Sequence, residues 1–278
     1  AENREDLEAD VIVIADSGNI KSGVPTITTS LRGLVDGVIV VDQQMEPVHS
    51  GLGGGVVPDA FMILSRIIAS FHNEKGELLI EGLTPTEQDV FELSDEFVKS
   101  SLSSKGVELF EMDSYSKRLW LEPALSILAI DAPPVAESVN LLIPKAKAKV
   151  SLRLPPTEDP EHAMNMLEQH IKENTPFNAN VEFIPEAKGK GILVDPKNEF
   201  SSKLIESFNK HWENDVAYMG VGGSIPFANI FINEFPNSEI VLVGAGDEEG
   251  NAHAPNESVN LSDIERLIDS LTDALSSY

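Results

Sequence analysis

The strands that this sequence predicts are of two kinds, and their order along the chain constrains the fold more than any other feature. "DVIVIAD" (10–16) near the start and "IVLVGAG" (240–246) near the end are short and almost wholly apolar, which is typical of parallel strands buried on both faces. "KAKAKVSLRLP" (145–155) instead alternates strictly, as a strand with one buried face does. We therefore predict one α/β domain built from both ends of the chain, with a different unit inserted between them.

The inserted unit is predicted from strands and helices that alternate between about residues 26 and 188. "TITTSLRGLVDGVIVVD" (26–42) indicates one long strand or a hairpin, and "ANVEFIP" (179–185) a further strand. Apolar residues at helical spacing predict helices over 58–72, with Phe61, Leu64, Ile68 and Phe71 aligned; over 85–102, with Val90, Leu93 and Phe97; and over 159–174, with Ala163, Leu167 and Ile171. This order predicts a small α+β sandwich with one helix-covered face.

Two helices are predicted in the C-terminal part. The first, over 198–214, spaces Phe200, Leu204, Phe208 and Trp212 four residues apart. The last begins at Ser262, with Glu265 three residues on as a capping box. The predicted domains are thus 1–25 and 189–278, two segments of one α/β domain, and 26–188, the inserted α+β unit.

Composition bounds the function classes. A net charge of −26 argues against nucleic-acid binding, which needs a basic footprint. No apolar run approaches the roughly 20 residues of a spanning helix, so no membrane partner is expected. The absence of cysteine excludes disulfides and thiolate metal sites and agrees with a reducing, cytoplasmic location.

Asp16 and His253 are candidate metal ligands because each follows a predicted buried strand. Ligands of open α/β sheets gather outside the carboxyl ends of strands, and carboxylate and imidazole groups are ligands that zinc accepts. The alternatives are a strand-end Asp that caps a turn and a loop His that is merely exposed.

Three further features in the chain carry candidate chemistry. His49 stands before a run of glycines in "EPVHSGLGGG" (46–55) and would donate to a developing oxyanion, or else belongs to a flexible turn. Arg153 offers a bidentate guanidinium to a substrate carboxylate, or else is an exposed cross-strand charge. "GVGGSIPFAN" (220–229) offers glycine amides and the Ser224 hydroxyl, but it has neither the Lys of a phosphate loop nor a G-x-S-x-G elbow.

Five motifs together, in this order, form a specific set: "ADSGN", "RGLVDGVIVVDQQMEPVHSGLGGGVVPDA", "IPKAKAKVSLRLPP", "GVGGSIPF" and "GDEEGNAHAPNESV". The set resembles the two-zinc metallopeptidase family that includes carnosine dipeptidases, carboxypeptidase G and succinyl-diaminopimelate desuccinylase. The "GGSIP" and "HSG" turns are most similar to the carnosine-dipeptidase branch. The resemblance runs from about residue 9 to the end, and it implies a zinc-exopeptidase-like catalytic domain with an inserted lid that dimerises.

The resemblance implies roles for the metal and for catalysis. Asp16 matches the aspartate that binds one zinc, and His253 the histidine that binds the other; manganese or cobalt are alternative metals. His49 matches a lid histidine that reaches into the partner subunit's active site and stabilises the charge developing on the scissile carbonyl.

The resemblance also implies a substrate site. Arg153 matches the arginine that binds the substrate's terminal carboxylate, and Asn140 falls at a substrate-contacting position where this branch often has Thr. Gly223 and Ser224 belong to the Gly-Gly-Ser-Ile-Pro loop that lines the site.

The sequence also departs from the family pattern. The family's His-x-Asp segment, its bridging aspartate and its Glu-Glu pair precede the position of Asp16, and "AENREDLEAD" (1–10) contains none of them. The second substrate-site histidine expected near "PEAKGKGILVD" (185–195) is also absent. The chain therefore resembles the C-terminal part of such an enzyme, and we expect this polypeptide alone to be inactive.

The expected function of the parent enzyme is metal-dependent dipeptide hydrolysis as a homodimer. Within the family, the alternative is a deacylase or desuccinylase of N-acyl amino acids. Outside it, the alternative is a dimerisation or binding module without catalysis.

Overall fold

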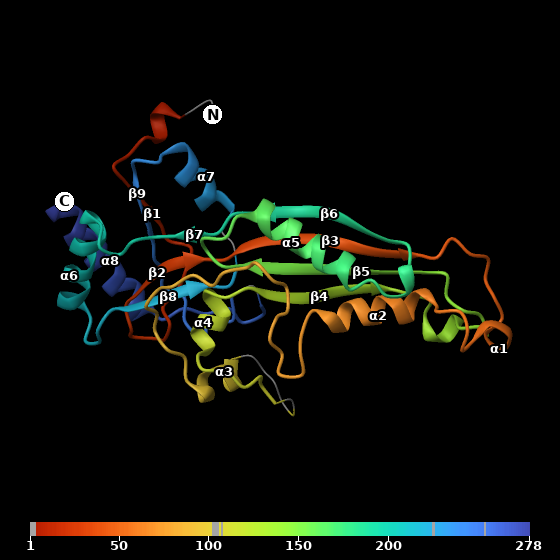
Figure 1. Ribbon diagram of the computed structural model, residues 1–278. Coiled ribbons are helices and arrows are strands. Elements are labelled where there is room, and N and C mark those ends of the chain that lie inside the picture. Colours follow the sequence, from red (N-terminus) through yellow and green to blue (C-terminus); the bar gives the residue numbers. More distant parts are fainter. Residues whose placement is uncertain (1–3, 102–105, 107, 224–225, 253) are drawn as a thin grey trace. The chain divides into compact units, whose positions relative to one another are not determined.

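The computed structural model describes residues 4–101, 106, 108–223, 226–252 and 254–278, and it contains two compact units. Unit 1 comprises residues 1–32, 87–121 and 191–278, and unit 2 comprises residues 33–86 and 122–190. Figure 1 shows helices and strands in both units, so the fold is α/β as predicted. Within the described residues, no helix is both long and apolar enough to cross a bilayer.

Unit 1 is a mixed sheet with helices. Its strands are β1 (Val11–Ile14), β2 (Thr26–Leu31), β7 (Ile192–Leu193), β8 (Ala217–Val221) and β9 (Glu239–Leu242). Its α-helices are α3 (Asp95–Ser101), α4 (Tyr115–Trp120), α6 (Glu199–His211), α7 (Pro226–Glu234) and α8 (Leu261–Ser277), and η1 (Glu5–Leu7) is a 3-10 turn. The sheet order is β1-β9-β2-β7, with β8 paired to β2.

The parallel strand predicted near the start and the strand near the end pair directly. β1 lies parallel to β9, in register from Val11–Glu239 to Ile14–Leu242. The helix stripe predicted for α6 is confirmed, because Phe200, Leu204, Phe208 and Trp212 are all buried in one cluster.

Unit 2 is an antiparallel sheet with helices on one face. Its strands are β3 (Gly33–Asp42), β4 (Ala124–Asp131), β5 (Lys145–Leu154) and β6 (Val181–Gly189), in the order β4-β5-β3-β6. Its α-helices are α1 (Ser50–Gly53), α2 (Ala60–Ser70) and α5 (Pro160–Glu173), and η2 (Val135–Glu137) and η3 (Pro176–Asn178) are 3-10 turns. Figure 1 shows α2 and α5 running along this sheet.

The alternation of β5 determines which face of this sheet is covered. Ala146, Ala148, Val150, Leu152 and Leu154 all belong to the buried cluster that also contains the inner residues of α2 and α5. The predicted sandwich with one helix-covered face is therefore confirmed. The predicted stripe of α5 is buried as well: Ala163, Leu167 and Ile171 are at most 2% exposed.

Several sequence predictions are wrong in detail. Residues 26–42 form neither one strand nor a hairpin, because β2 and β3 belong to different sheets and break at Arg32. The helix expected over 85–102 forms only over Asp95–Ser101. Its first part has no regular secondary structure, and the Phe91 amide donates to the Tyr218 carbonyl at 2.7 Å.

The stripe predicted for α2 is only partly right, and the predicted cap is wrong. Leu64 and Phe71 are buried and Ile68 packs against the same cluster, but Phe61 is 38% exposed, and the remaining buried residues of α2 are Ala60, Ile63 and Ile67. The last helix begins at Leu261, and its N-cap is Asn260, whose side chain accepts a hydrogen bond from the Ser262 amide. Ser262 is therefore not the cap, and the predicted box with Glu265 does not form.

Candidate active site

The carboxyl ends of β1 and β9 share one edge of the sheet in unit 1, and two loops meet there. The Ser17 amide donates to the Val243 carbonyl at 3.3 Å, and the Asn19 amide donates to the Gly246 carbonyl at 2.6 Å. A Cβ added at Gly244 would lie 1.7 Å from the Ser17 carbonyl oxygen. Only glycine therefore permits this approach, which brings the turn after Asp16 against the loop that leads to His253.

Asp16 lies at this edge with an exposed carboxylate. His253 falls outside the described residues, but the loop on either side of it is described. That loop is closed by the Gly250 amide on the Asp247 carbonyl at 3.1 Å and by the Ser258 amide on the Gly250 carbonyl at 2.9 Å. The structure thus brings together the two segments that carry the candidate ligands, although they are far apart in sequence.

A network of buried polar groups anchors the loop that follows Asp16. The Asp263 carboxylate, which is fully buried, accepts from the Gly23 amide at 2.8 Å and from the Ser22 hydroxyl at 3.4 Å. The Asn260 side chain donates to the Ser22 hydroxyl at 2.7 Å, and the Ser22 amide donates to Glu248 at 3.0 Å. The start of α8 and both loops are therefore held as one assembly.

The sequence patterns did not predict this network. The available signal was the pair Asn260 and Asp263, an N-cap residue followed three positions later by an acid. Asp263 does not close a capping box; it reaches the loop between β1 and β2 instead.

Whether a metal ion fits this edge depends on the ligand atoms and the unpartnered polar groups that lie there. Among the described residues the Asp16 carboxylate has no hydrogen-bond or ion-pair partner, and the nearby Asn19, which is 6% exposed, has its Nδ2 unpartnered. A buried donor without an acceptor is costly, so an oxygen-bearing group near it would be stabilising. Within the described part of the chain, however, no three His, Asp or Glu residues are grouped to hold a metal ion. The described residues alone do not complete a metal site.

His49 and Asn140 lie together at one end of unit 2. The Ser50 amide donates to the Asn140 carbonyl at 2.9 Å, and the Leu142 amide donates to the Val48 carbonyl at 2.8 Å. His49 is the N-cap of α1, and its Nδ1 accepts from the Gly51 amide at 3.1 Å. Both His49 and Asn140 are exposed. We name residues 48–53 and 140–142 the His49 tip.

Arg153 lies at the other end of the same sheet. It pairs with Leu34 on β3 and Ala124 on β4, so neither cross-strand neighbour is charged. Its neighbours on β5, Leu152 and Leu154, point into the core, so Arg153 lies on the face away from α2 and α5. Among the described residues, its guanidinium has no ion-pair partner.

The sheet separates Arg153 from the His49 tip. Leu34 pairs with Arg153, and Asp42, eight residues further along β3, pairs with Lys145. At about 3.4 Å per residue, these two positions are about 27 Å apart. Figure 1 shows α1 beyond that far end of β3 and β5.

Gly223 follows β8 and is half-buried, whereas Ser224 falls outside the described residues. β8 runs parallel to β2, and β2 is antiparallel to β9. The carboxyl end of β8 therefore lies at the opposite edge of the sheet from the carboxyl ends of β1 and β9. α7 begins after this loop, at Pro226.

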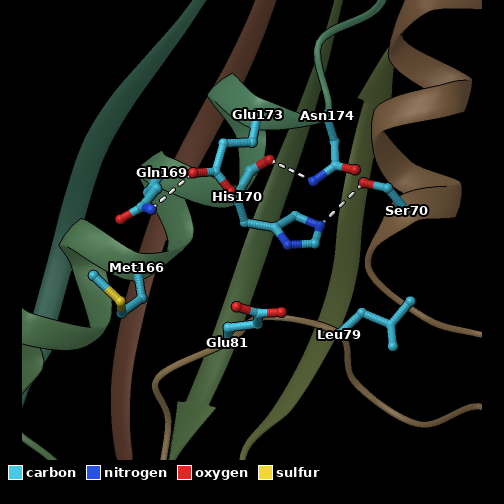
Figure 2. A pocket seen from close by; sticks show the side chains of 8 residues that line it. All are labelled: Ser70, Leu79, Glu81, Met166, Gln169, His170, Glu173 and Asn174. Atoms are coloured by element: carbon cyan, nitrogen blue, oxygen red, sulfur yellow. Dashed lines mark hydrogen bonds between the residues drawn. The ribbon is translucent and has the colours of Figure 1, made fainter.

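A cavity of about 340 Å³ in unit 2 contains none of the predicted site residues (Figure 2). It is lined by Ser70, Leu79, Glu81, Met166, Gln169, His170, Glu173 and Asn174. The His170 ring stacks on Phe71 with centroids 5.2 Å apart, and burial lowers the pKa of His170, although Glu173 and Glu81 act in the opposite direction.

His170 and Ser70 do not form a nucleophilic pair. His170 Nε2 lies 3.1 Å from Ser70 Oγ, but the Ser70 hydroxyl donates to the Ile67 carbonyl at 2.7 Å. A nucleophilic serine must donate to its histidine. Ser70 instead accepts from the ring, so this contact stabilises the packing of α2 against α5.

Comparison with known proteins identifies the family. Residues 29–179 match the family described as peptidase dimerisation domain. The cysteinylglycine-S-conjugate dipeptidase of Corynebacterium striatum is 33% identical over 275 residues, which is 95% of this chain and 59% of that protein. The chain thus spans less than two thirds of this relative's length.

Solved structures share the fold. The di-peptidase Dug1p from Saccharomyces cerevisiae superposes with a TM-score of 0.79 at 22% identity, over 100% of this chain and 62% of that one. Human carnosine dipeptidase 1 gives a TM-score of 0.77 at 19% identity, over 100% and 62%. The match to the peptidase dimerisation domain covers more than half of the chain, and the chain therefore belongs to the M20 metallopeptidase family.

Proposed function

We propose that the whole protein is a metal-dependent dipeptidase that acts as a homodimer, with unit 2 joining the subunits. The proposal is supported by the relatives named above, one of which is called a cysteinylglycine-S-conjugate dipeptidase. In this proposal Asp16 and His253 are metal ligands, and a bound zinc ion, or manganese or cobalt, would supply an activated water once its ligand set is complete.

The distance between His49 and Arg153 within one subunit is the observation that supports an active site shared between two subunits. A dipeptide spans about 7 Å when extended, whereas the strand positions that lead to these two side chains are about 27 Å apart. Both residues of one subunit therefore cannot contact the same dipeptide. A site that uses both must take Arg153 from one subunit and His49 from the other.

Each residue then has a defined task. Arg153 binds the substrate's terminal carboxylate through its fork of donors, and Gly223 and Ser224 are further proposed substrate contacts. His49 of the partner subunit donates a hydrogen bond to the oxygen of the scissile carbonyl as negative charge develops on it. Asn140 contacts substrate alongside His49, because both belong to the His49 tip.

Exposed apolar side chains at the His49 tip support the proposal that another subunit covers it. Leu52 of the tip is 84% exposed, and Val56, whose amide donates to the Gly53 carbonyl of the tip at 3.1 Å, is 83% exposed. Apolar side chains grouped at an exposed tip are stabilised when another surface covers them. Covering them would also exclude water around the His49 ring, which strengthens its hydrogen bond.

Mixing two inactive variants of the whole protein tests the shared site. His49→Ala and Arg153→Ala homodimers each lose activity. In a mixed dimer, one site contains both substitutions and the other contains neither. With random mixing, about a quarter of wild-type activity returns. No recovery in dimers shown to exchange subunits would contradict a site shared between subunits.

The substrate class needs a separate test. A kinetic panel of dipeptides against N-acyl amino acids should favour dipeptides; preference for the acylated compounds would indicate the deacylase or desuccinylase activity.

The 278-residue polypeptide by itself should be inactive, because its described residues group no three metal ligands. Dipeptide cleavage by this polypeptide with added zinc would contradict that. Were the whole protein to bind no metal either, the alternative of a non-catalytic dimerisation module would be favoured. A cytoplasmic location stays a prediction.

A further inference from the structure

The His49 ring makes an unusual cap. Side-chain oxygens of Ser, Thr, Asp and Asn are the usual N-cap acceptors, but α1 is capped by a ring nitrogen, with the Gly51 amide donating to His49 Nδ1 at 3.1 Å. The tip's backbone bonds, from Ser50 to Asn140 and from Leu142 to Val48, hold the chain on both sides of this contact.

This hydrogen bond determines which ring nitrogen carries the proton. A backbone N–H can donate only to a nitrogen with a free lone pair, so Nδ1 is unprotonated while the bond exists. In a neutral imidazole the proton then lies on Nε2. Among the described residues Nε2 has no partner, so its N–H is free to meet a group from outside the unit.

Gly51 leaves space for the His49 ring to pack against the backbone. A Cβ at Gly51 would lie 3.2 Å from His49 Nδ1 and 3.3 Å from Cε1, closer than ordinary contact. Gly53 is buried below, where a Cβ would meet Val48 at 2.8 Å and Leu142 at 3.0 Å.

We propose that the Gly51 backbone N–H is a positioning group that fixes the Nε2–H tautomer of the His49 ring and directs that N–H outward as the tip's donor. The part of this inference that concerns the reaction rests on the proposed function, because it identifies Nε2 as the atom that meets the scissile carbonyl oxygen. The tautomer itself is a property of the tip alone.

Nitrogen NMR of the 278-residue polypeptide, labelled with ¹⁵N, tests the tautomer without any activity. We expect His49 Nδ1 to resonate as an unprotonated nitrogen and to show a coupling to the Gly51 amide nitrogen across the hydrogen bond. The same chain in denaturant, where the tautomers mix freely, is the reference. A protonated Nδ1, or a tautomer mixture equal to that of the unfolded chain, would overturn the proposal.

Two amide replacements in the whole protein test which atom acts. In His49→Asn the side-chain amide replaces Nδ1 and can still cap α1, but no donor reaches the Nε2 position. In His49→Gln the amide nitrogen reaches that position. We expect kcat/KM of the Gln variant to exceed that of His49→Ala at least tenfold, whereas the Asn variant falls to the Ala level with its folding intact.

The outcomes separate the two proposals. An Asn variant as active as the Gln variant, or more active, would show that Nε2 is not the donor and would overturn the positioning role. If the whole protein cleaves no dipeptide while the NMR result stands, the proposed function fails and the tautomer assignment survives.

Discussion

The edge of unit 1 and the His49 tip of unit 2 hold candidate site residues in opposite ways. At the edge, buried side chains bind backbone amides, with the Asp263 carboxylate fully enclosed. At the tip, backbone bonds hold the exposed His49 and Asn140. Substitutions at the edge should therefore disturb stability and function together, whereas those at the tip should disturb function with little loss of stability.

The two units can be observed separately. Both tryptophans, Trp120 and Trp212, belong to unit 1, and so do all three tyrosines. Tryptophan fluorescence therefore reports the unfolding of unit 1, and backbone NMR signals can follow unit 2.

Gly244→Ala should have the largest effect on stability. Its Cβ would lie 1.7 Å from the Ser17 carbonyl oxygen, so the ends of β1 and β9 must separate. We expect a loss of about 3 kcal/mol or more in the unfolding free energy of unit 1, by denaturant titration with fluorescence detection.

Gly246→Ala is the matched control, because its Cβ would meet its nearest neighbours only at 3.8 Å. It should change stability by less than about 1 kcal/mol. Equal losses in the two variants would show that the close approach at Gly244 does not hold the edge.

Asp263→Ala should have the second-largest effect on stability. It leaves the Gly23 amide and the Ser22 hydroxyl without this acceptor, and we expect a loss of about 2–3 kcal/mol by the same titration. Asp269→Ala, at an exposed position on α8, should lie within about 0.5 kcal/mol of wild type. A loss at Asp263 no larger than at Asp269 would contradict an anchoring role.

His49→Ala should have a small effect on folding. It removes one cap at an exposed turn, so unit 2 should lose at most about 1 kcal/mol, followed by NMR in denaturant. A loss of stability as large as that of Asp263→Ala would contradict the expectation that substitutions at the tip cost less stability than substitutions at the edge.

The buried histidine of unit 2 should give the smallest effect, a pH dependence. Burial lowers the folded-state pKa of His170 below its ordinary value of 6.5. The unfolded chain therefore binds more protons between the folded pKa and about pH 7.5, so the stability of unit 2 should fall as pH drops through that window and level off below it. Denaturant titrations followed by NMR at several pH values measure this slope.

His170→Gln should remove that part of the slope. An unchanged slope in His170→Gln would show that other groups cause it.

Local periodicity was sufficient for three elements that each pack one face on a single core. The stripes of α5 and α6 and the alternation of β5 could be read directly from spacing, because burial on one side repeats with the geometry of the element. Spacing was insufficient at residues 85–94, where apolar residues at helical intervals lie outside any helix. The Phe91 and Leu93 amides there find partners in Tyr218 and the Ser116 hydroxyl instead of in a helix.

The sequence by itself determined the two kinds of strand, the helix-covered sandwich and which residues could carry chemistry, because these depend on residue type and short-range spacing. Only the tertiary structure decided which of them meet. It placed the turn after Asp16 against the loop that leads to His253, through the pairing of β1 with β9. It also set His49 beside Asn140 and far from Arg153. The register of strands fixes such distances, and a register between distant segments leaves no mark in local sequence.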